Sequence, residues 1–213
     1  MGARNDQKMV TIALDDAGEL ALEGLFAGGA GADCGGAVIA PPHPLFGGSL
    51  DSPVLSELAM AFRQAGRASL CFNWRGVGAS GGEPSGEAAD ADQDYAAALR
   101  QLAETVPGPL AACGYSFGSA AALRVGGRYP RVRELLLVAP PPALLSAAAL
   151  RAFPGRVLAI AGERDAVAPP AELEQLLAAL PGAELAVVPE ADHFFARGLA
   201  AIGRAAAAWL GRG

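Results

Sequence analysis

The chain has 213 residues, of which 52% are hydrophobic and 18% are charged, and its formal net charge is −6 at pH 7. This length and hydrophobic content suit a single folded domain over residues 1–213 and exclude a largely disordered chain. A chain with a negative net charge lacks the basic face that binds phosphate groups. Neither nucleic acid nor an anionic membrane surface is therefore expected as a partner.

The pattern of apolar residues predicts a sheet flanked by helices. Two strands come first, over residues 9–14 and 20–26, joined by a hairpin turn at Asp15-Asp16-Ala17-Gly18. Further strands are predicted over 37–40, 68–74, 110–113, 135–138, 157–161 and 185–188, and helices over 51–64, 87–105, 117–127, 143–153, 171–180 and 199–210. Alternating strands and helices predict a mainly parallel sheet of about eight strands, antiparallel at its N-terminal hairpin, with helices on both faces.

The N-terminus and the cysteines indicate a cytoplasmic protein. Residues 1–6 lack the apolar core of a signal peptide, and no apolar run reaches the length of a membrane span. The three cysteines are odd in number, and Cys71 and Cys113 lie in apolar runs, so we expect free thiols in a reducing compartment. The oligomeric state stays open between monomer and homodimer.

The segment Gly114-Tyr115-Ser116-Phe117-Gly118 lies between a predicted strand and a predicted helix. A serine flanked by glycines in that setting is typical of a nucleophile elbow, a tight turn that exposes the serine hydroxyl at the carboxyl end of a strand. The following helix directs its free N–H groups at whatever binds there. Ser116 is therefore the candidate nucleophile.

Two later loops supply partners for this serine. His193 follows the last strand, and an imidazole there can take the serine proton at neutral pH. Asp165 follows the strand before it and can orient the imidazole, with Glu163 as its nearby rival. Taken separately, His193 is equally consistent with an ordinary loop histidine, and Asp165 with a turn-forming or helix-capping aspartate. Together they predict a catalytic triad in the order Ser, Asp, His, which is the order of α/β-hydrolases.

The loop at residues 41–49 follows the strand at 37–40 and is expected to face the elbow. Stabilising a tetrahedral oxyanion takes two N–H donors. One is the N–H of Phe117. Because Pro44 has none, the second comes from Leu45 or Phe46, and we favour Leu45. His43 and Phe46 in this loop, with Tyr115 and Phe194, are the expected substrate-binding residues.

The chain resembles the α/β-hydrolase superfamily over essentially its whole length, and within it the small single-domain bacterial serine hydrolases with a His-Pro-Leu-aromatic-Gly-Gly oxyanion loop. The matching segments are His43 to Gly48, Phe72 to Ser80, Gly114 to Gly118 and Ala191 to Phe195. Relatives often have a histidine where this chain has Pro41, which bears on the geometry of the loop. The resemblance implies hydrolysis of a small acyl ester through an acyl-serine, with neither metal nor cofactor, and a structural role for Arg75.

The interval from residue 139 to 156 is too short for the helical cap of larger relatives. We therefore expect an open site that favours short, soluble substrates. The candidate walls of its acyl pocket are Leu144, Leu145, Phe153, Phe194 and Phe195.

Several alternatives stay open from the sequence. The same triad could cleave thioesters or amides or transfer the acyl group, and the fold could serve as a non-catalytic binding module. An acidic run of Glu83, Glu87, Asp90, Asp92 and Asp94 is predicted to be a solvated helix start rather than a metal site. The glycine-rich stretch at 76–82 lacks the spacing and lysine of a nucleotide-binding loop.

Overall fold

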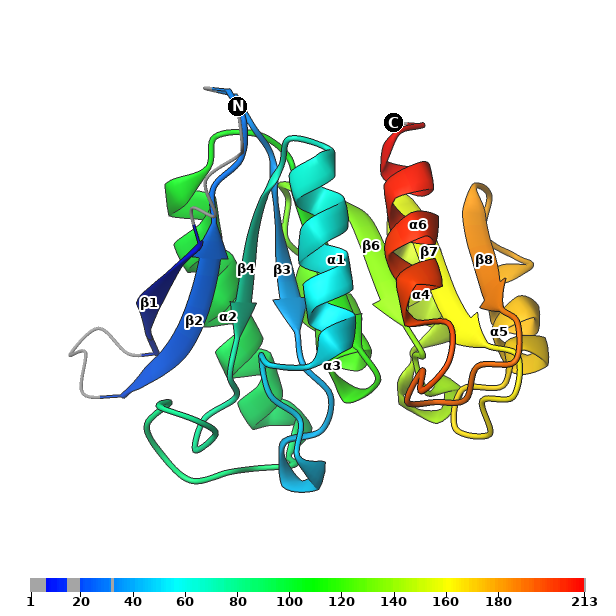
Figure 1. The fold of residues 1–213 in the computed structure, drawn as a ribbon, viewed down its shortest axis with the longest axis horizontal. Helices are drawn as coiled ribbons and strands as arrows, with labels where there is room; N and C mark the ends of the chain where they lie inside the picture. The colour runs from blue at the N-terminus through cyan, green and yellow to red at the C-terminus, as the bar shows by residue number, and fades with distance from the viewer. Residues whose placement is uncertain (1–6, 15–19, 32, 213) are drawn as a thin grey trace.

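A computed structural model describes residues 7–14, 20–31 and 33–212. A mixed sheet crosses the molecule. Over these residues the sheet has eight strands in the order β1-β2-β4-β3-β5-β6-β7-β8 (Figure 1). The strands are β1 Gln7–Ala13, β2 Ala21–Ala27, β3 Gly36–Ala40, β4 Ala68–Phe72, β5 Leu110–Tyr115, β6 Val132–Val138, β7 Arg156–Gly162 and β8 Ala183–Val188. All eight predicted strands are present.

Strand directions agree with the predicted sheet. β1 pairs with β2 and β2 with β4 antiparallel, and every other neighbouring pair is parallel. The predicted turn at 15–18 lies outside the described residues. In the parallel part of the sheet, Ala40 pairs with Gly114, and Tyr115 pairs with Val138. This register brings the carboxyl ends of β3, β5 and β6 to one edge, where ligands of parallel sheets gather.

Helices cover both faces of the sheet. They are α1 Pro53–Gln64, α2 Ala88–Thr105, α3 Phe117–Ala121, α4 Ala147–Ala152, α5 Pro170–Leu177 and α6 Leu199–Leu210. In Figure 1, α1 and α6 lie in front of the sheet, and α2 and α3 lie behind it. Their apolar faces form two buried clusters, one on each side, because alternate residues of each central strand point to opposite faces.

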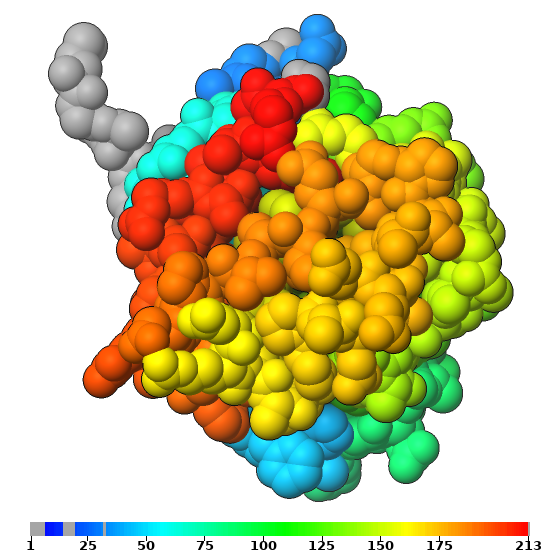
Figure 2. Space-filling model, turned by 90° about the vertical axis from the view of Figure 1, so that its right-hand side faces the viewer, coloured from blue at the N-terminus to red at the C-terminus, as the bar shows by residue number. Residues whose placement is uncertain are grey.

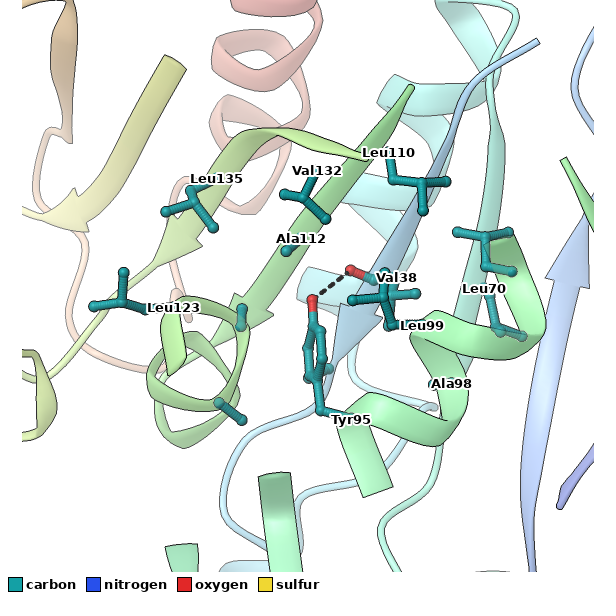
Figure 3. Packing of buried hydrophobic residues seen from close by; sticks show 14 of the residues in the cluster. Val38, Leu70, Tyr95, Ala98, Leu99, Leu110, Ala112, Leu123, Val132 and Leu135 are labelled. Atoms are coloured by element: carbon teal, nitrogen blue, oxygen red, sulfur yellow. Dashed lines mark hydrogen bonds between the residues drawn. The ribbon is translucent and has the colours of Figure 1, made fainter. Parts of the chain in front are cut away.

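Tyr95 of α2 shows how a helix is fitted to this sheet. It is fully buried beside Leu99 and Val38, and its hydroxyl donates to the carbonyl oxygen of Val38 (Figure 3). The same hydroxyl lies 3.1 Å from the carbonyl oxygen of Cys113. A phenol with acceptors in reach can be buried without leaving its polar atom unpaired.

Two predicted helices are shorter than expected. The segment 117–127 begins as α3 and continues as a wide π-helical turn over Ala122–Gly126. Gly126 packs so closely on β5 that an added Cβ would lie 2.2 Å from the Cβ of Ala112. The segment 143–153 is a short 3-10 turn, Pro142–Leu144, followed by α4, because the Ser146 hydroxyl accepts from the Ala149 N–H and starts a new helix.

The last third of the chain forms the β8 side of the molecule, drawn from yellow to red in Figure 2. The two predicted partners of Ser116 come from this third. Cys71 and Cys113 are buried free thiols, as predicted, and Cys34 is also free. Within the described ranges, no helix has both the length and the apolar character needed to cross a bilayer.

Candidate active site

Ser116 occupies a strained turn between β5 and α3. Its φ of 53° and ψ of −116° are values that a side chain other than glycine seldom adopts. A Cβ on Gly114 would lie 2.2 Å from the carbonyl carbon of Gly118, and one on Gly118 would lie 2.5 Å from the Pro41 carbonyl oxygen. Only glycine fits at either position, since backbone occupies the space that a side chain needs.

Hydrogen bonds from neighbouring backbone and a second serine hold the strained turn. The Ser116 N–H donates to the Val138 carbonyl oxygen at 2.8 Å. The buried Ser119 hydroxyl lies 2.7 Å from the Gly114 carbonyl oxygen and 3.1 Å from that of Val138. Sequence reasoning missed Ser119, and a polar residue in an otherwise small and apolar helix start was the available signal.

The structure brings Ser116, His193 and Asp165 into one line of contacts. Ser116 Oγ lies 2.9 Å from His193 Nε2, and His193 Nδ1 lies 2.8 Å from Asp165 Oδ2. The His193 side chain is 13% exposed and that of Asp165 is fully buried. Glu163, the rival carboxylate, instead accepts the N–H of Glu190.

Asp165 is held as a carboxylate. Its second oxygen, Oδ1, accepts the N–H groups of Val167 and Ala168 at 2.8 and 2.7 Å. Burial by itself raises the pKa of this carboxyl, but the hydrogen bonds from His193 and these two N–H groups outweigh it, so the pKa lies below its ordinary value. An ionised Asp165 fixes the His193 tautomer that leaves Nε2 free to accept a proton.

Tyr115 and Phe195 hold the loop that carries His193. The Tyr115 hydroxyl donates to the main-chain carbonyl oxygen of His193 at 2.8 Å. Burial and the nearby carboxylate of Asp165 raise the pKa of Tyr115 to about 12, so its hydroxyl stays protonated and able to donate. Phe195, at a φ of 52°, is buried against the ring of Tyr115. Tyr115 thus lines the cavity and also positions His193.

The loop after β3 differs from the prediction in one respect. The Leu45 N–H donates to Nδ1 of the His43 ring at 3.2 Å, so it is not free for an oxyanion, and Leu45 is not among the cavity-lining residues. The N–H groups of Phe46 and Gly48 both donate to the His43 carbonyl oxygen. Among the described residues, the main-chain N–H groups of His43 and Phe117 donate to no acceptor. Both residues line the cavity with Ser116.

A cavity of about 810 Å³ opens above Ser116. Its lining residues are Pro42, His43, Phe46, Gly47, Gly48, Ser52, Pro53, Val54, Tyr115, Ser116, Phe117, Leu144, Val167, His193, Phe194, Phe195, Ala196 and Leu199. Of the predicted walls, Leu144, Phe194 and Phe195 contribute. Phe153 is buried in the core, and Leu145 packs against the core instead, because the 3-10 turn ends before it.

The strand order and the turn that carries Ser116 define an α/β-hydrolase fold. The family profile described as Serine aminopeptidase, S33 matches residues 47–150. The chain belongs to the α/β-hydrolase superfamily.

Three solved structures show which proteins resemble it. A protein of unknown function from Agrobacterium tumefaciens is 28% identical, with a TM-score of 0.84, over 96% of this chain and 95% of that one. An α/β serine hydrolase homologue from Coxiella burnetii is 25% identical, with a TM-score of 0.80, over 99% of both chains. A serine hydrolase without a lid from Xanthomonas campestris is 24% identical over 99% and 96%, with a TM-score of 0.78, and shares the fold.

Proposed function

We propose that this protein is a serine hydrolase that cleaves carboxylic esters through an acyl-serine intermediate. The observation that carries the proposal is the unbroken line of contacts from Ser116 through His193 to Asp165 beneath an open cavity. Neutral serine is a weak nucleophile, and a base within hydrogen-bonding distance activates it.

Acylation begins with Ser116. Its Oγ attacks the ester carbonyl carbon while its proton passes to His193 Nε2, and Asp165 stabilises the resulting imidazolium. The tetrahedral intermediate collapses as the bond to the alkoxy oxygen breaks, and His193 returns its proton to that oxygen. The alcohol leaves, and the acyl group stays on Ser116.

Hydrolysis completes the cycle. His193 takes a proton from a water molecule, whose oxygen attacks the acyl carbon. The bond to Ser116 Oγ then breaks, and His193 gives the proton back to that oxygen. The products are a carboxylic acid and the free enzyme, so each turnover consumes one ester and one water.

The negative oxygen of each intermediate is stabilised by two main-chain donors, the N–H groups of Phe117 and His43. Phe117 is the first residue of α3, where helix N–H groups have no partner within the helix. His43 takes the place that sequence reasoning gave to Leu45, because the Leu45 N–H is engaged by the His43 ring. Losing one such donor typically costs about 3–4 kcal/mol of barrier.

Substituting the nucleophile tests the proposal. We expect Ser116→Ala to lower kcat on a p-nitrophenyl ester by about three to six orders of magnitude, because no other group can carry the acyl intermediate. The substitution should also abolish labelling by a fluorophosphonate, which reacts with activated serines. Ser56→Ala, at an exposed serine of α1, is the matched control and should keep both activities.

Near-normal turnover by the Ser116→Ala variant would refute the assignment. A wild-type protein that forms no fluorophosphonate adduct would instead favour a binding module on the same fold. Parallel assays with a thioester and an amide of the same acyl group, and with a competing alcohol, separate ester hydrolysis from the other reactions of this triad.

A further inference from the structure

We propose that the site selects esters whose acyl or alkoxy part is an uncharged, apolar group considerably larger than acetyl. This inference rests on the proposed serine hydrolase function and names its substrate class. It departs from the expectation of short, soluble substrates, which was drawn from the absence of room for a helical cap. The cavity is larger and more apolar than short, soluble substrates require.

The size of the cavity carries the first step. A volume of about 810 Å³ lies within the range of about 300–1,000 Å³ that drug-sized ligands fill. An acetyl group would leave most of it filled with water. An extended or aromatic group would displace that water from apolar walls, which is favourable in proportion to the area buried.

The chemistry of the walls carries the second step. No aspartate, glutamate, lysine or arginine is among the lining residues, whose side chains are mainly those of Pro, Val, Leu and Phe. A substrate bearing a free ammonium or carboxylate would lose hydration there without gaining a counter-ion, which is costly. The walls therefore discriminate against charged esters and against peptides with a free N-terminus.

The mouth of the cavity carries the third step. Phe46 is 85% exposed and Phe194 77%, and Leu144 and Val167 are also exposed. We call these four residues the apolar rim. Single exposed apolar residues need no explanation, but four that line one cavity mark a binding surface.

Three residues of the apolar rim contact residues of the candidate site. The Val167 N–H donates to Asp165 Oδ1, and the Phe194 ring meets the His193 ring edge-on with centroids 5.6 Å apart. The Phe46 ring lies 4.7 Å from that of His43. An apolar chain that leaves the cavity would thus contact side chains held in place beside the triad.

Turnover of graded substrates tests the inference. With p-nitrophenyl acetate, butanoate, hexanoate and octanoate, we expect kcat/KM to rise roughly two- to fourfold per added methylene. A parallel series of acetate esters of longer alcohols shows whether the acyl or the alkoxy part occupies the cavity. The mono-p-nitrophenyl ester of succinate, with a charged end, should be turned over at least about tenfold more slowly than the butanoate.

Variants of the apolar rim provide the second readout. Phe46→Ala and Phe194→Ala should each lower the ratio of octanoate to acetate kcat/KM by about three- to tenfold, because each loses apolar contact with the longer chain. Val187→Ala is the matched control, since Val187 is an exposed apolar residue of β8 outside the cavity, and it should leave the ratio unchanged.

The possible failures are distinguishable. A flat or falling profile in both series, with fluorophosphonate labelling of Ser116 intact, would overturn the substrate class and leave the proposed hydrolase standing. Loss of both turnover and labelling would reject the hydrolase itself. If the Phe194→Ala variant changes the sedimentation coefficient but not the chain-length profile, the rim is a contact between copies and the inference is wrong.

Discussion

The ring and the main-chain N–H of His43 differ in their hydrogen bonding. Its ring accepts the Leu45 N–H and packs against Phe117 with ring centroids 4.6 Å apart, while its main-chain N–H donates to no acceptor among the described residues. Burial lowers the pKa of this imidazole, so Nδ1 remains an acceptor at neutral pH. The side chain thus shapes the loop whose backbone we propose to bind the oxyanion.

A His43→Pro substitution distinguishes the role of the His43 main-chain N–H from that of its ring. The φ of His43 is −61°, close to the value that proline imposes. We expect His43→Pro to lower kcat by about 10²- to 10³-fold below His43→Ala, because both variants lack the ring and only proline lacks the donor. Steady-state kinetics on one ester measures this, with circular dichroism to check folding. Equal kcat in the two variants would place the second donor elsewhere.

The residues of the site differ in how far sequence reasoning reaches them. Ser116, Asp165 and His193 were predicted because each follows a strand of a parallel sheet, and the sheet brings strand ends together. The oxyanion loop was harder. Its sequence shows that Pro44 has no N–H, but not that the His43 ring engages the N–H of Leu45, which depends on side-chain rotamer.

At the scale of elements, Arg75 ties the loop after β4 to helix α2. Its guanidinium pairs with Asp90 and Asp94 at 2.7 Å each, and Asp94 is 1% exposed. Arg124 pairs similarly with Asp92. The acidic run predicted as a solvated helix start is therefore largely engaged in ion pairs. The sequence could not show this, because the partners lie far along the chain.

Removing Arg75 would leave a buried charge in the core. We expect Arg75→Ala to lower the free energy of unfolding by about 3 kcal/mol at pH 7, because Asp94 loses its counter-ion. Arg124→Ala is the control, and its more exposed pair should cost less than about 1 kcal/mol. Urea unfolding measures both. Equal effects would mean that Asp94 does not depend on Arg75.

The same variant should respond to pH. Burial raises the pKa of Asp94 above its ordinary 3.8 even though Arg75 opposes the shift, and without Arg75 it rises further. The folded variant then binds more protons than the unfolded chain, so the stability lost at pH 7 is partly recovered as the pH falls towards about 5. A deficit that stays constant over this range would argue against a charged, buried Asp94.

Elements were predicted best where a single periodic pattern ran their whole length. The predicted helix at 199–210 has the bounds of α6, and the predicted strand 157–161 lies within β7. Predictions failed where a local hydrogen bond or a close packing contact overrode the apolar pattern. The Ser146 cap divides one predicted helix, and the close approach of Gly126 to β5 accompanies a π-helical turn in another.

For the whole molecule, the sheet separates two apolar cores that carry one tryptophan each. Trp74 is buried on the side of α2, and Trp209 on the side of α1 and α6. Both cores share the central strands β3, β5, β6 and β7, whose alternate side chains supply them. Neither core can therefore lose its packing without exposing the strands that support the other.

We propose that residues 1–213 unfold as one cooperative unit. Because the chain has two tryptophans, Trp74→Phe and Trp209→Phe each leave one reporter, in opposite cores. In each variant, the urea midpoint from tryptophan fluorescence should coincide with the midpoint from far-ultraviolet circular dichroism. Two separated midpoints in either variant would show that the cores unfold independently.

The bond from the Tyr115 hydroxyl to the carbonyl oxygen of His193 has a consequence for motion at the site. Tyr115 is the last residue of β5 and immediately precedes Ser116, so this strand positions Ser116 and is also bonded to the backbone of His193. We expect Ser116 and His193 to move together when the end of β5 moves, because this bond links them. Their separation should therefore change little as the sheet flexes, even though His193 follows Ser116 by 77 positions in the sequence.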